Sequence, residues 1–595
     1  MSTSPSAALT RDRRLRSWAR ALAADSELSA VDLATAVARQ VQAAFGTEPS
    51  TGTPSPIGQD PPDGWTNPWL PGIVHEQAVS PERRTARGAW YTPRSVVEGL
   101  VRLAVPGDQP PPAFVADPTC GGGAFLLAAL DHLVAGGVTP TAALASIGGQ
   151  DIDPDAVVVT GLSIRCWAAA NGVRDVDPDT IVTCGDALDR YPDPWPTSGV
   201  IVGNPPFGTP LRTGAVADSV TRFREGRENL LGPYADLAAA HLLAAVERAT
   251  AGATVALVQP QSVLSGRDTE GLRTHCRSRA PLRALWAARE AVFDAGVRAC
   301  AVVVAPGAET DRPVRLAAGP DVTPVDRGSS VVAGSWSGLA AAALGAPSLP
   351  IELTSPTEET GRLGDLITAT AGFRDEYYGL VAACGEWTGD DGAEPNRLVT
   401  VGSVDPLGSL WGTEPIKFGR RPWHRPTVDL DALDGKVRAW TERQMVPKVV
   451  LATQSRVLEP VVDRIGTLIP ATPLLAIHAD AEDLDRVAAV LLAPPVVAWA
   501  WQRWFGSALA VDALKLAARQ VAELPLPTDR GAWQEAAAMV AAAPDRQPAA
   551  AAWALACAVA EVMNRAYGAD DGVYRWWLAR ARRPAPVDIA AVDAG

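Results

Sequence analysis

The residues best suited to chemistry lie in one short stretch, from Val200 to Gly208. Three β-branched residues and a glycine predict a buried strand, which two consecutive prolines end because proline cannot donate to a sheet ladder. Beyond the strand stand an asparagine amide, a prolyl carbonyl and an aromatic ring, at Asn204, Pro205, Pro206 and Phe207. Two such acceptors can hold one amino group while the ring stacks on the flat group that carries it. The stretch predicts a site for an exocyclic amine or a planar amide, although Asn-Pro-Pro is also a common turn.

An upstream unit of strand, acid, glycine turn and helix runs from Phe114 through Asp117 and Gly121 to Leu133. In open parallel sheets, ligands bind beyond the carboxyl ends of the strands, and glycines let the backbone approach a ligand closely. The spacing differs from the dinucleotide motif and has no Gly-Lys-Ser/Thr for phosphates. An aspartate at the strand end therefore suits a cationic amine better than a pyrophosphate.

Two further predicted strands also end in carboxylates, at Asp151 and at Asp186. Asp151 can accept both hydroxyls of a ribose, as acids do in other nucleotide sites. The alternative is that this region caps the helix over 156–170, and Asp153 suits that role. Asp186 can accept an adenine amino group. Three predicted strands that each end in an aspartate, followed by the strand that ends in Asn-Pro-Pro-Phe, predict a nucleotide-type α/β fold.

These motifs in this order resemble the N6-adenine (amino) DNA methyltransferases of the gamma arrangement, over residues 85 to 305. The resemblance implies a Rossmann-like, S-adenosylmethionine-dependent domain, followed by a mixed α/β target-recognition domain and flanking helices. It implies that Asn204, Pro205, Pro206 and Phe207 receive a flipped adenine, with Phe293 on the other face of the base. A core phenylalanine is the alternative for Phe293. The implied cofactor-binding residues are Tyr91, Thr92, Pro93, Asp117, Pro118, Cys120, Gly121, Gly123, Phe125, Asp151, Ile152, Asp186 and Ala187.

Composition sets the broad class of the protein. The chain has 595 residues, 47% hydrophobic, and its apolar runs fall short of the ~20 residues of a membrane span. Seven cysteines are scattered without a Cys-x-x-Cys pair, which predicts neither a disulfide framework nor a zinc site. Together with the missing signal-type apolar core, this predicts a cytoplasmic protein that needs no metal.

The predicted domain order has five parts. Residues 1–75 are a helical extension and a Pro/Gly-rich linker, and 76–310 are the catalytic domain. A Gly-, Ala- and Pro-rich linker over 311–350 leads to a target-recognition domain over 351–530. Ala- and Trp-rich helices follow over 531–595.

The net charge of −14 conceals a locally basic stretch, residues 415–456, with nine Lys or Arg and four Asp or Glu. DNA binding depends on such local patches and not on the total charge. The alternative is a solvated arginine-rich face. The predicted DNA-binding residues are Lys417, Arg420, Arg421, Arg425 and Lys448.

The sequence therefore predicts a site-specific enzyme that methylates N6 of an adenine in double-stranded DNA. A restriction-modification or phage-defence setting is expected, with separate restriction or defence proteins as candidate partners and no membrane. One alternative is a methyltransferase that acts on RNA. Another is a methyltransferase that acts on a protein glutamine amide, since such enzymes also use Asn-Pro-Pro with an aromatic residue. A non-catalytic DNA-binding subunit is the remaining alternative.

Overall fold

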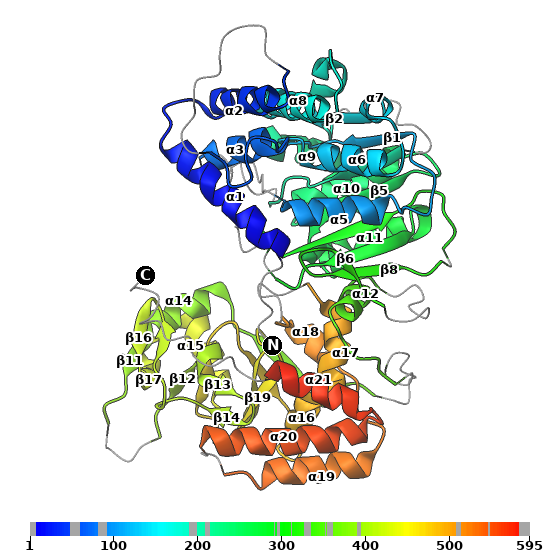
Figure 1. Cartoon of the computed structure of the whole chain (residues 1–595). Coiled ribbons are helices and arrows are strands. Elements are labelled where there is room, and N and C mark those ends of the chain that lie inside the picture. Colours follow the sequence, from blue (N-terminus) through cyan, green and yellow to red (C-terminus); the bar gives the residue numbers. More distant parts are fainter. Residues whose placement is uncertain are drawn as a thin grey trace. The chain divides into compact units, whose positions relative to one another are not determined.

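The computed structural model describes residues 7–47, 60–80, 92–189, 199–208, 215–290, 292–293, 298–310, 312–326, 335–350, 353, 361–389, 394–506, 513–544 and 548–581. The chain divides into two compact units, Met1–Leu344 and Gly345–Gly595. Figure 1 shows both units with their elements labelled.

The first unit is built on a nine-stranded sheet in the order β3-β2-β1-β4-β5-β7-β6-β8-β9. The strands β3, β2, β1, β4 and β5 are parallel, and β7 runs antiparallel to both of its neighbours. This confirms the predicted α/β class. Buried apolar residues in β4 and β5 explain why these strands read as continuous hydrophobic runs. The strands are β1 (Phe114–Asp117), β2 (Ile147–Asp151), β3 (Val182–Cys184), β4 (Gly199–Gly203), β5 (Thr254–Pro260), β6 (Leu282–Ala287), β7 (Ala299–Val304), β8 (Arg315–Ala318) and β9 (Thr323–Pro324).

Aspartates begin two helices of this unit at the edge where the parallel strands end. Asp153 accepts a hydrogen bond from the Asp155 backbone as the N-cap of α8, as its sequence position predicted. Asp236 caps α10 in the same way. The helices are α1 (Ala7–Ala24), α2 (Ala30–Ala44), α3 (Leu70–Ala78), α5 (Arg94–Ala104), α6 (Ala124–Ala135), α7 (Pro140–Leu144), α8 (Pro154–Ala170), α9 (Ala215–Arg224), α10 (Leu237–Arg248), α11 (Glu270–Arg279) and α12 (Trp336–Ala343).

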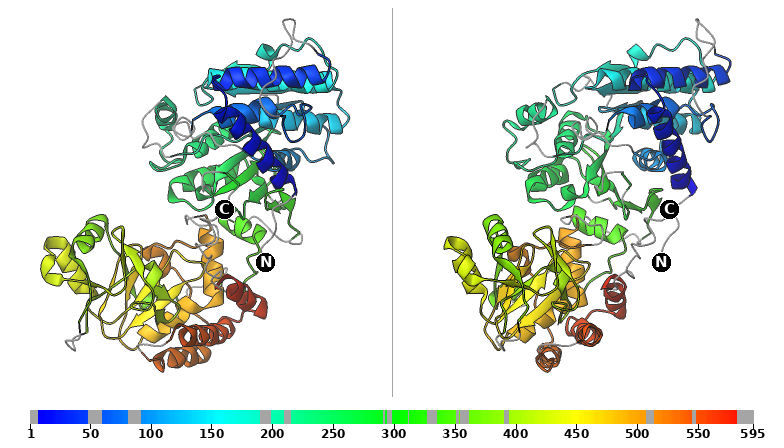
Figure 2. Two further views of the ribbon diagram at one scale, coloured as in Figure 1. Left: turned by 60° about the vertical axis from the view of Figure 1, so that its left-hand side comes forward. Right: turned by 90° about the vertical axis from the view of Figure 1, so that its left-hand side faces the viewer.

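The helices of the N-terminal extension belong to the core of the first unit. Leu33 and Val37 of α2 lie in the same buried cluster as Leu70 of α3 and Trp167 of α8. Helix α2 packs on α3 and α8, and α1 packs on α3 and α5, as Figures 1 and 2 show. The predicted helical periodicity is present, but its apolar face covers the predicted catalytic domain instead of forming a separate extension.

The prediction that residues 311–350 form a linker is wrong. Strand β8 pairs in parallel with β6, β9 pairs with β8, and α12 packs on β6. Leu316 and Ala317 are buried in this sheet, as are Leu339 and Ala340 of α12. Small residues are common in linkers and also at closely packed sheet edges, so their abundance did not distinguish the two.

The second unit is mixed α/β, with one antiparallel sheet (β10-β21-β18-β19), one mixed sheet (β11-β17-β12-β20) and two hairpins. Its strands are β10 (Thr368–Ala371), β11 (Cys384–Glu386), β12 (Arg397–Val399), β13 (Val404–Asp405), β14 (Gly408–Ser409), β15 (Ile416–Phe418), β16 (Arg421–Trp423), β17 (Pro426–Val428), β18 (Lys448–Ala452), β19 (Glu459–Asp463), β20 (Leu468–Pro470) and β21 (Leu475–His478). Its helices are α14 (Arg374–Ala383), α15 (Gly435–Gln444), α16 (Leu484–Leu492), α17 (Pro494–Trp504), α18 (Ala518–Ala522), α19 (Arg530–Ala541), α20 (Ala549–Ala566) and α21 (Asp571–Ala581). The helices α19 to α21 pack on each other and on α16 and α17 within this unit.

No single helix of the described ranges is long and apolar enough to cross a membrane. Helices α16 and α17 pass that test only as a pair, with a bend of 64° between them, and most of their residues are buried.

Candidate functional site

The predicted prolyl turn, residues 204–208, lies at the carboxyl edge of the first sheet, between the ends of β1 and β5. Strand β4 pairs with both of these strands and ends directly before Asn204. The Asn204 side chain is half-buried, and its Nδ2 donates a hydrogen bond to Thr92 Oγ1 over 2.9 Å. The far end of the turn is held at Gly208, whose N–H donates to Asp236 Oδ2 and whose carbonyl accepts from Leu237 N–H. The helix cap of α10 therefore fixes the turn in place.

The two aromatic residues predicted to sandwich a base do come together. The rings of Phe207 and Phe293 meet edge to face, with centroids 5.8 Å apart and an interplanar angle of 81°. Both side chains are buried. Because the rings touch, a flat base can lie between them only after they separate.

Asp117 lies beside the prolyl turn at the end of β1. A Cβ atom added at Gly203 would be 2.6 Å from Asp117 Oδ1, so the glycine before Asn204 makes room for this carboxyl group. Burial raises the pKa of Asp117 to about 8, with a smaller contribution in the same direction from the charge of Asp151. The Thr119 N–H donates to Oδ1, and no cationic side chain of the described residues lies within ion-pair distance of Asp117. The position favours a cationic ligand.

The glycine turn between β1 and α6 is tied to the next strand and the next helix. Asp151 Oδ2 accepts from Gly121 N–H over 2.9 Å, and Asp151 Oδ1 accepts from Asp153 N–H. From α8, the Thr160 hydroxyl donates to the Gly121 carbonyl and the Ser163 hydroxyl donates to the Gly122 carbonyl. These contacts from α8, which the sequence did not point to, set the shape of the turn.

The glycine turn is open at one position and tightly packed at the next. Gly121 has φ +54°, and an added Cβ would meet no atom within 4 Å. At Gly122, an added Cβ would lie 2.8 Å from Cα of Gly72 in α3. Space for a ligand therefore exists at Gly121, while the N-terminal helices support the turn from Gly122.

The remaining predicted cofactor residues divide by exposure. Ile152 is 44% exposed beside Asp151 and can cover a flat ring. Four others are buried in the core and support the site from beneath, at Pro118, Cys120, Phe125 and Ala187. Pro93 precedes α5, and Gly123 begins α6 with φ +89°. Tyr91 lies outside the described residues.

Asp186 is held by residues that the sequence did not identify. Its Oδ2 accepts from the hydroxyl of Ser219 in α9, and its Oδ1 accepts from Leu188 N–H. Arg248 of α10 donates to the carbonyls of Ala187 and Leu188, so the loop after β3 is fixed on both sides. With these contacts formed, Asp186 has fewer lone pairs to offer an adenine amino group than its position predicted.

Residues 76–304 match the model of the N-6 DNA Methylase family. This part of the chain is similar to the N-6 DNA methylases. It contains the prolyl turn, the glycine turn and the three strands predicted to end in an aspartate. The predicted recognition is confirmed at this level, and the gamma arrangement stays a prediction. No match was found among curated proteins.

The fold of the whole chain also has a solved counterpart. The type IIL restriction-modification enzyme MmeI, solved in complex with DNA, is 11% identical, with a TM-score of 0.57 over 99% of this chain and 98% of that chain. The type IIG restriction endonuclease BpuSI is 13% identical, with a TM-score of 0.40 over 97% and 80%. At such identities the first likeness concerns the fold of both units, and the second supports no further argument.

Outside the matched residues 76–304, the predicted DNA-binding residues of the second unit differ in exposure. Lys417, Arg420, Arg421 and Arg425 are all exposed. The first three lie on the β15–β16 hairpin, whose two turn residues Gly419 and Arg420 have φ of +58° and +64°. Positive φ at both positions is typical of the tight type I′ turn.

Side chains of α14 hold the β15–β16 hairpin in place. Phe418 is buried against Tyr377 of α14, with ring centroids 5.3 Å apart, and an added Cβ at Gly419 would lie 2.7 Å from Val381. Trp440 is also buried in this small core. The aromatic residues of the basic stretch thus support the hairpin, and its cations remain at the surface.

The prediction that Lys448 binds DNA is wrong, because its side chain is 0% exposed. Its Nζ lies 2.5 Å from Asp463 Oδ2, and Asp463 also accepts from the N–H groups of Gly466, Thr467 and Leu468. Burial lowers the pKa of Lys448, and the charge of Asp463 partly opposes that shift. The residue joins β18 to β19 and cannot reach a phosphate.

Proposed function

We propose that the protein is a site-specific DNA methyltransferase that transfers a methyl group from S-adenosylmethionine to N6 of a flipped-out adenine. The observation that carries this proposal is the Asn204-Pro205-Pro206-Phe207 turn, fixed at the carboxyl edge of the sheet beside Asp117 within the residues that match the N-6 DNA Methylase family. A restriction-modification or phage-defence role in the cytoplasm is part of the proposal, and separate restriction or defence proteins are candidate partners.

The cofactor site is proposed at the glycine turn. The open space at Gly121, the buried carboxyl of Asp117 and the exposed face of Ile152 fit a ligand with a cationic end and a flat ring. Asp151 accepts from Gly121 N–H and Asp153 N–H, and because one carboxylate oxygen can accept more than one hydrogen bond, we propose that it also accepts from ribose hydroxyls. When bound, S-adenosylmethionine supplies an electrophilic methyl group on its sulfonium sulfur.

Catalysis is proposed to rest on two acceptors and no covalent nucleophile. The Asn204 Oδ1 and the Pro205 carbonyl accept the two amino hydrogens of the target adenine, which favours the pyramidal, partly positive nitrogen of the transition state. The nitrogen–carbon bond forms as the sulfur–carbon bond breaks, its electron pair stays on sulfur, and the surplus proton on nitrogen passes to solvent. Bringing an adenine out of a duplex costs a few kcal/mol, which stacking on Phe207 partly offsets.

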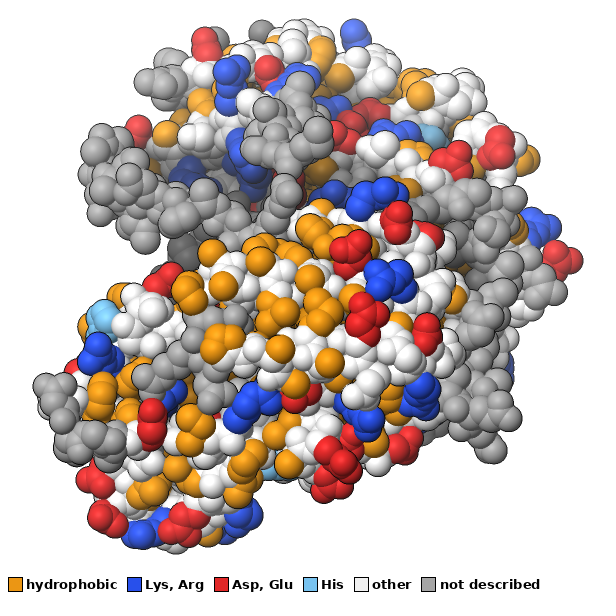
Figure 3. All heavy atoms as spheres, turned by 90° about the horizontal axis from the view of Figure 1, so that it is seen from below, with side chains coloured by type: hydrophobic (Ala, Val, Ile, Leu, Met, Phe, Trp, Pro, Cys, Tyr) orange, Lys and Arg blue, Asp and Glu red, His pale blue; other side chains and the backbone are white. Residues whose placement is uncertain are grey.

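The exposed cations of the β15–β16 hairpin are the proposed DNA contact in the second unit. No ion pair joins Lys417, Arg420 or Arg421 to an acid of the described residues. On the molecular face drawn in Figure 3, Lys and Arg are interspersed with Asp and Glu instead of forming one positive field. The proposed contact is local to the hairpin, in keeping with the net charge of −14.

The test is transfer of a labelled methyl group to duplex DNA, to single-stranded RNA and to protein, followed by nucleoside analysis. We expect label on N6-methyladenine in duplex DNA. Asn204→Ala should lose at least about 10²- to 10³-fold in kcat, as when an oxyanion-hole donor is removed, and keep its Kd for the cofactor. Asn171→Ala, at the exposed end of α8, is the matched control. Label confined to RNA or protein, or an active Asn204→Ala variant, would overturn the proposal.

A further inference from the structure

The contact between Asn204 and Thr92 links two motifs that are 112 residues apart. Thr92 is only 5% exposed, and its hydroxyl accepts the Asn204 Nδ2–H over 2.9 Å. A partly buried hydrogen bond of this kind favours one orientation of the donor side chain, because breaking it leaves a polar group less well satisfied.

Orientation matters for an asparagine more than for most polar side chains. The last torsion of the side chain is broad and roughly two-fold, so the amide can present either its oxygen or its nitrogen to the same place. With Nδ2 directed at Thr92, Oδ1 is the atom left to face a neighbouring donor. A reversed amide would set its own N–H groups against the hydrogens of an amino group, and attraction would become repulsion.

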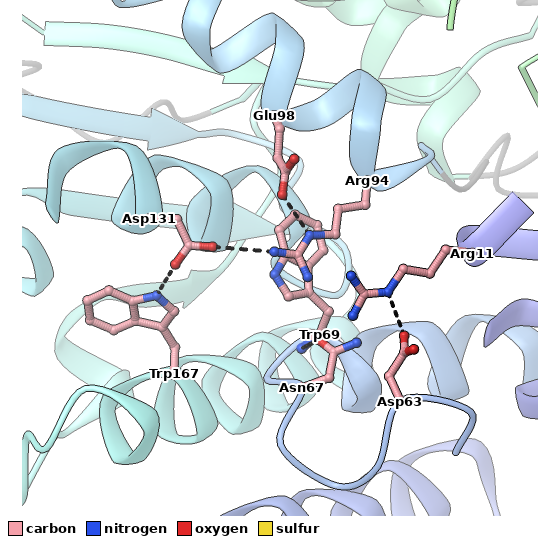
Figure 4. Close-up of polar contacts among 8 residues, drawn as sticks. All are labelled: Arg11, Asp63, Asn67, Trp69, Arg94, Glu98, Asp131 and Trp167. Atoms are coloured by element: carbon pink, nitrogen blue, oxygen red, sulfur yellow. Dashed lines mark hydrogen bonds and ion pairs between the residues drawn. The ribbon is translucent and has the colours of Figure 1, made fainter. Parts of the chain in front are cut away.

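The position of Thr92 is itself fixed by a network at the start of α5. The Pro93 carbonyl accepts from the N–H groups of Val96 and Val97. Arg94 bonds to Glu98 over 2.7 Å, lies over the Trp69 ring at 4.6 Å and pairs with Asp131, which also accepts from Trp167, as Figure 4 shows. The residue that holds Asn204 therefore stands on an anchored helix end.

We propose that Thr92 is a positioning residue, which orients the Asn204 amide so that Oδ1 accepts a hydrogen of the target amino group. This inference rests on the proposed function. It adds to the role that the family resemblance implies for Thr92, which is contact with the cofactor. Thr92 acts through Asn204 and not by touching the reacting atoms.

The experiment compares Thr92→Val, which keeps the shape of the side chain and removes the hydroxyl, with Thr92→Ser, which keeps the hydroxyl. For Thr92→Val we expect kcat on duplex DNA to fall about 10- to 100-fold, as for a misplaced catalytic group. The KM for DNA, and the Kd for S-adenosylmethionine measured on the protein alone, should change less than about 2-fold, since uniform binding is untouched. Thr92→Ser should restore most of kcat. Thr141→Val, at an exposed threonine of α7, is the matched control.

Other outcomes overturn the inference without touching the proposed function. If Thr92→Val raises the Kd for the cofactor and spares kcat at saturation, Thr92 serves the cofactor alone. If Thr92→Val and Thr92→Ser lose kcat equally, the hydroxyl is not the cause. Within an Asn204→Ala background, Thr92→Val should cost no further kcat, and an additive loss would show that the two residues act separately. Failure of the proposed function itself is distinguishable, because Asn204→Ala alone would then remain active.

Discussion

Asp117 in the first unit and Lys448 in the second are both fully buried ionisable residues, and their surroundings differ. Lys448 has a carboxylate at 2.5 Å. Among the described residues, Asp117 has a backbone N–H, the Thr119 side chain and a second acid nearby, and burial raises its pKa to about 8. A buried ionisable group with a partner of opposite charge is a structural element, while one without such a partner and with a strongly shifted pKa is a candidate ligand site. The comparison teaches that pairing, more than burial, separates the two roles.

The largest expected effect is the loss of stability when Lys448 is removed from its pair with Asp463. Lys448→Ala leaves the Asp463 carboxylate buried without its partner, which should lower the free energy of unfolding by about 3–5 kcal/mol. Chemical denaturation measures this. Lys417→Ala, at an exposed lysine of the same basic stretch, should stay within about 0.5 kcal/mol. A stable Lys448→Ala variant with weakened DNA binding would restore Lys448 to the DNA-contacting residues.

For Asp117, the prediction concerns how the stability of the protein depends on pH. The folded protein keeps the Asp117 proton up to about pH 8, whereas the unfolded chain loses it near 3.8. This group therefore makes wild-type stability fall as pH rises from about 4 to 8, by about 1.4 kcal/mol per pH unit as an upper limit. Asp117→Asn should lack that slope, so its stability relative to wild type should increase with pH over this window. Parallel pH profiles from thermal unfolding would contradict the prediction.

A smaller effect is expected at the contact beneath the glycine turn. An added Cβ at Gly72 would lie 2.7 Å from the Gly122 carbonyl oxygen. Gly72→Ala should therefore lose about 1–3 kcal/mol of stability through overpacking and shift the glycine turn, the proposed cofactor site. Calorimetry should show a higher Kd for S-adenosylmethionine. Gly107→Ala, where an added Cβ would meet open space, is the control and should change neither quantity.

The smallest effect is expected at the hairpin. Arg420→Glu with Arg421→Glu should weaken duplex binding by about tenfold or more and lower the salt dependence of binding, because each phosphate contact releases a counterion. The charge-matched control is Lys436→Glu with Arg443→Glu, at exposed positions of α15 in the same stretch. An equal loss in both double variants would mean that only total charge matters. Cofactor affinity should not change in either.

The carboxyl edge of the first unit's sheet was predictable because its signals are local. A strand, a polar side chain at its end and a glycine or proline turn lie within a few residues of each other, as at Asp117 and Asn204. Parallel strands then bring those ends to one edge of the sheet, so separate motifs meet without further information. The helix cap at Asp153 is local in the same sense.

The remaining assignments depended on contacts between distant parts of the chain. The sequence around Lys448 reads as basic, and only pairing with Asp463 across β18 and β19 makes it structural. The helices before residue 80 read as an extension, and only packing on α8 places them in the core. The sequence by itself therefore determined the α/β fold of the first unit and the placement of Asp117 and Asn204 at the carboxyl edge of its sheet. Tertiary structure decided which charges are paired, which segments are core and which way the Asn204 amide faces, because burial and partners are not properties of neighbouring residues.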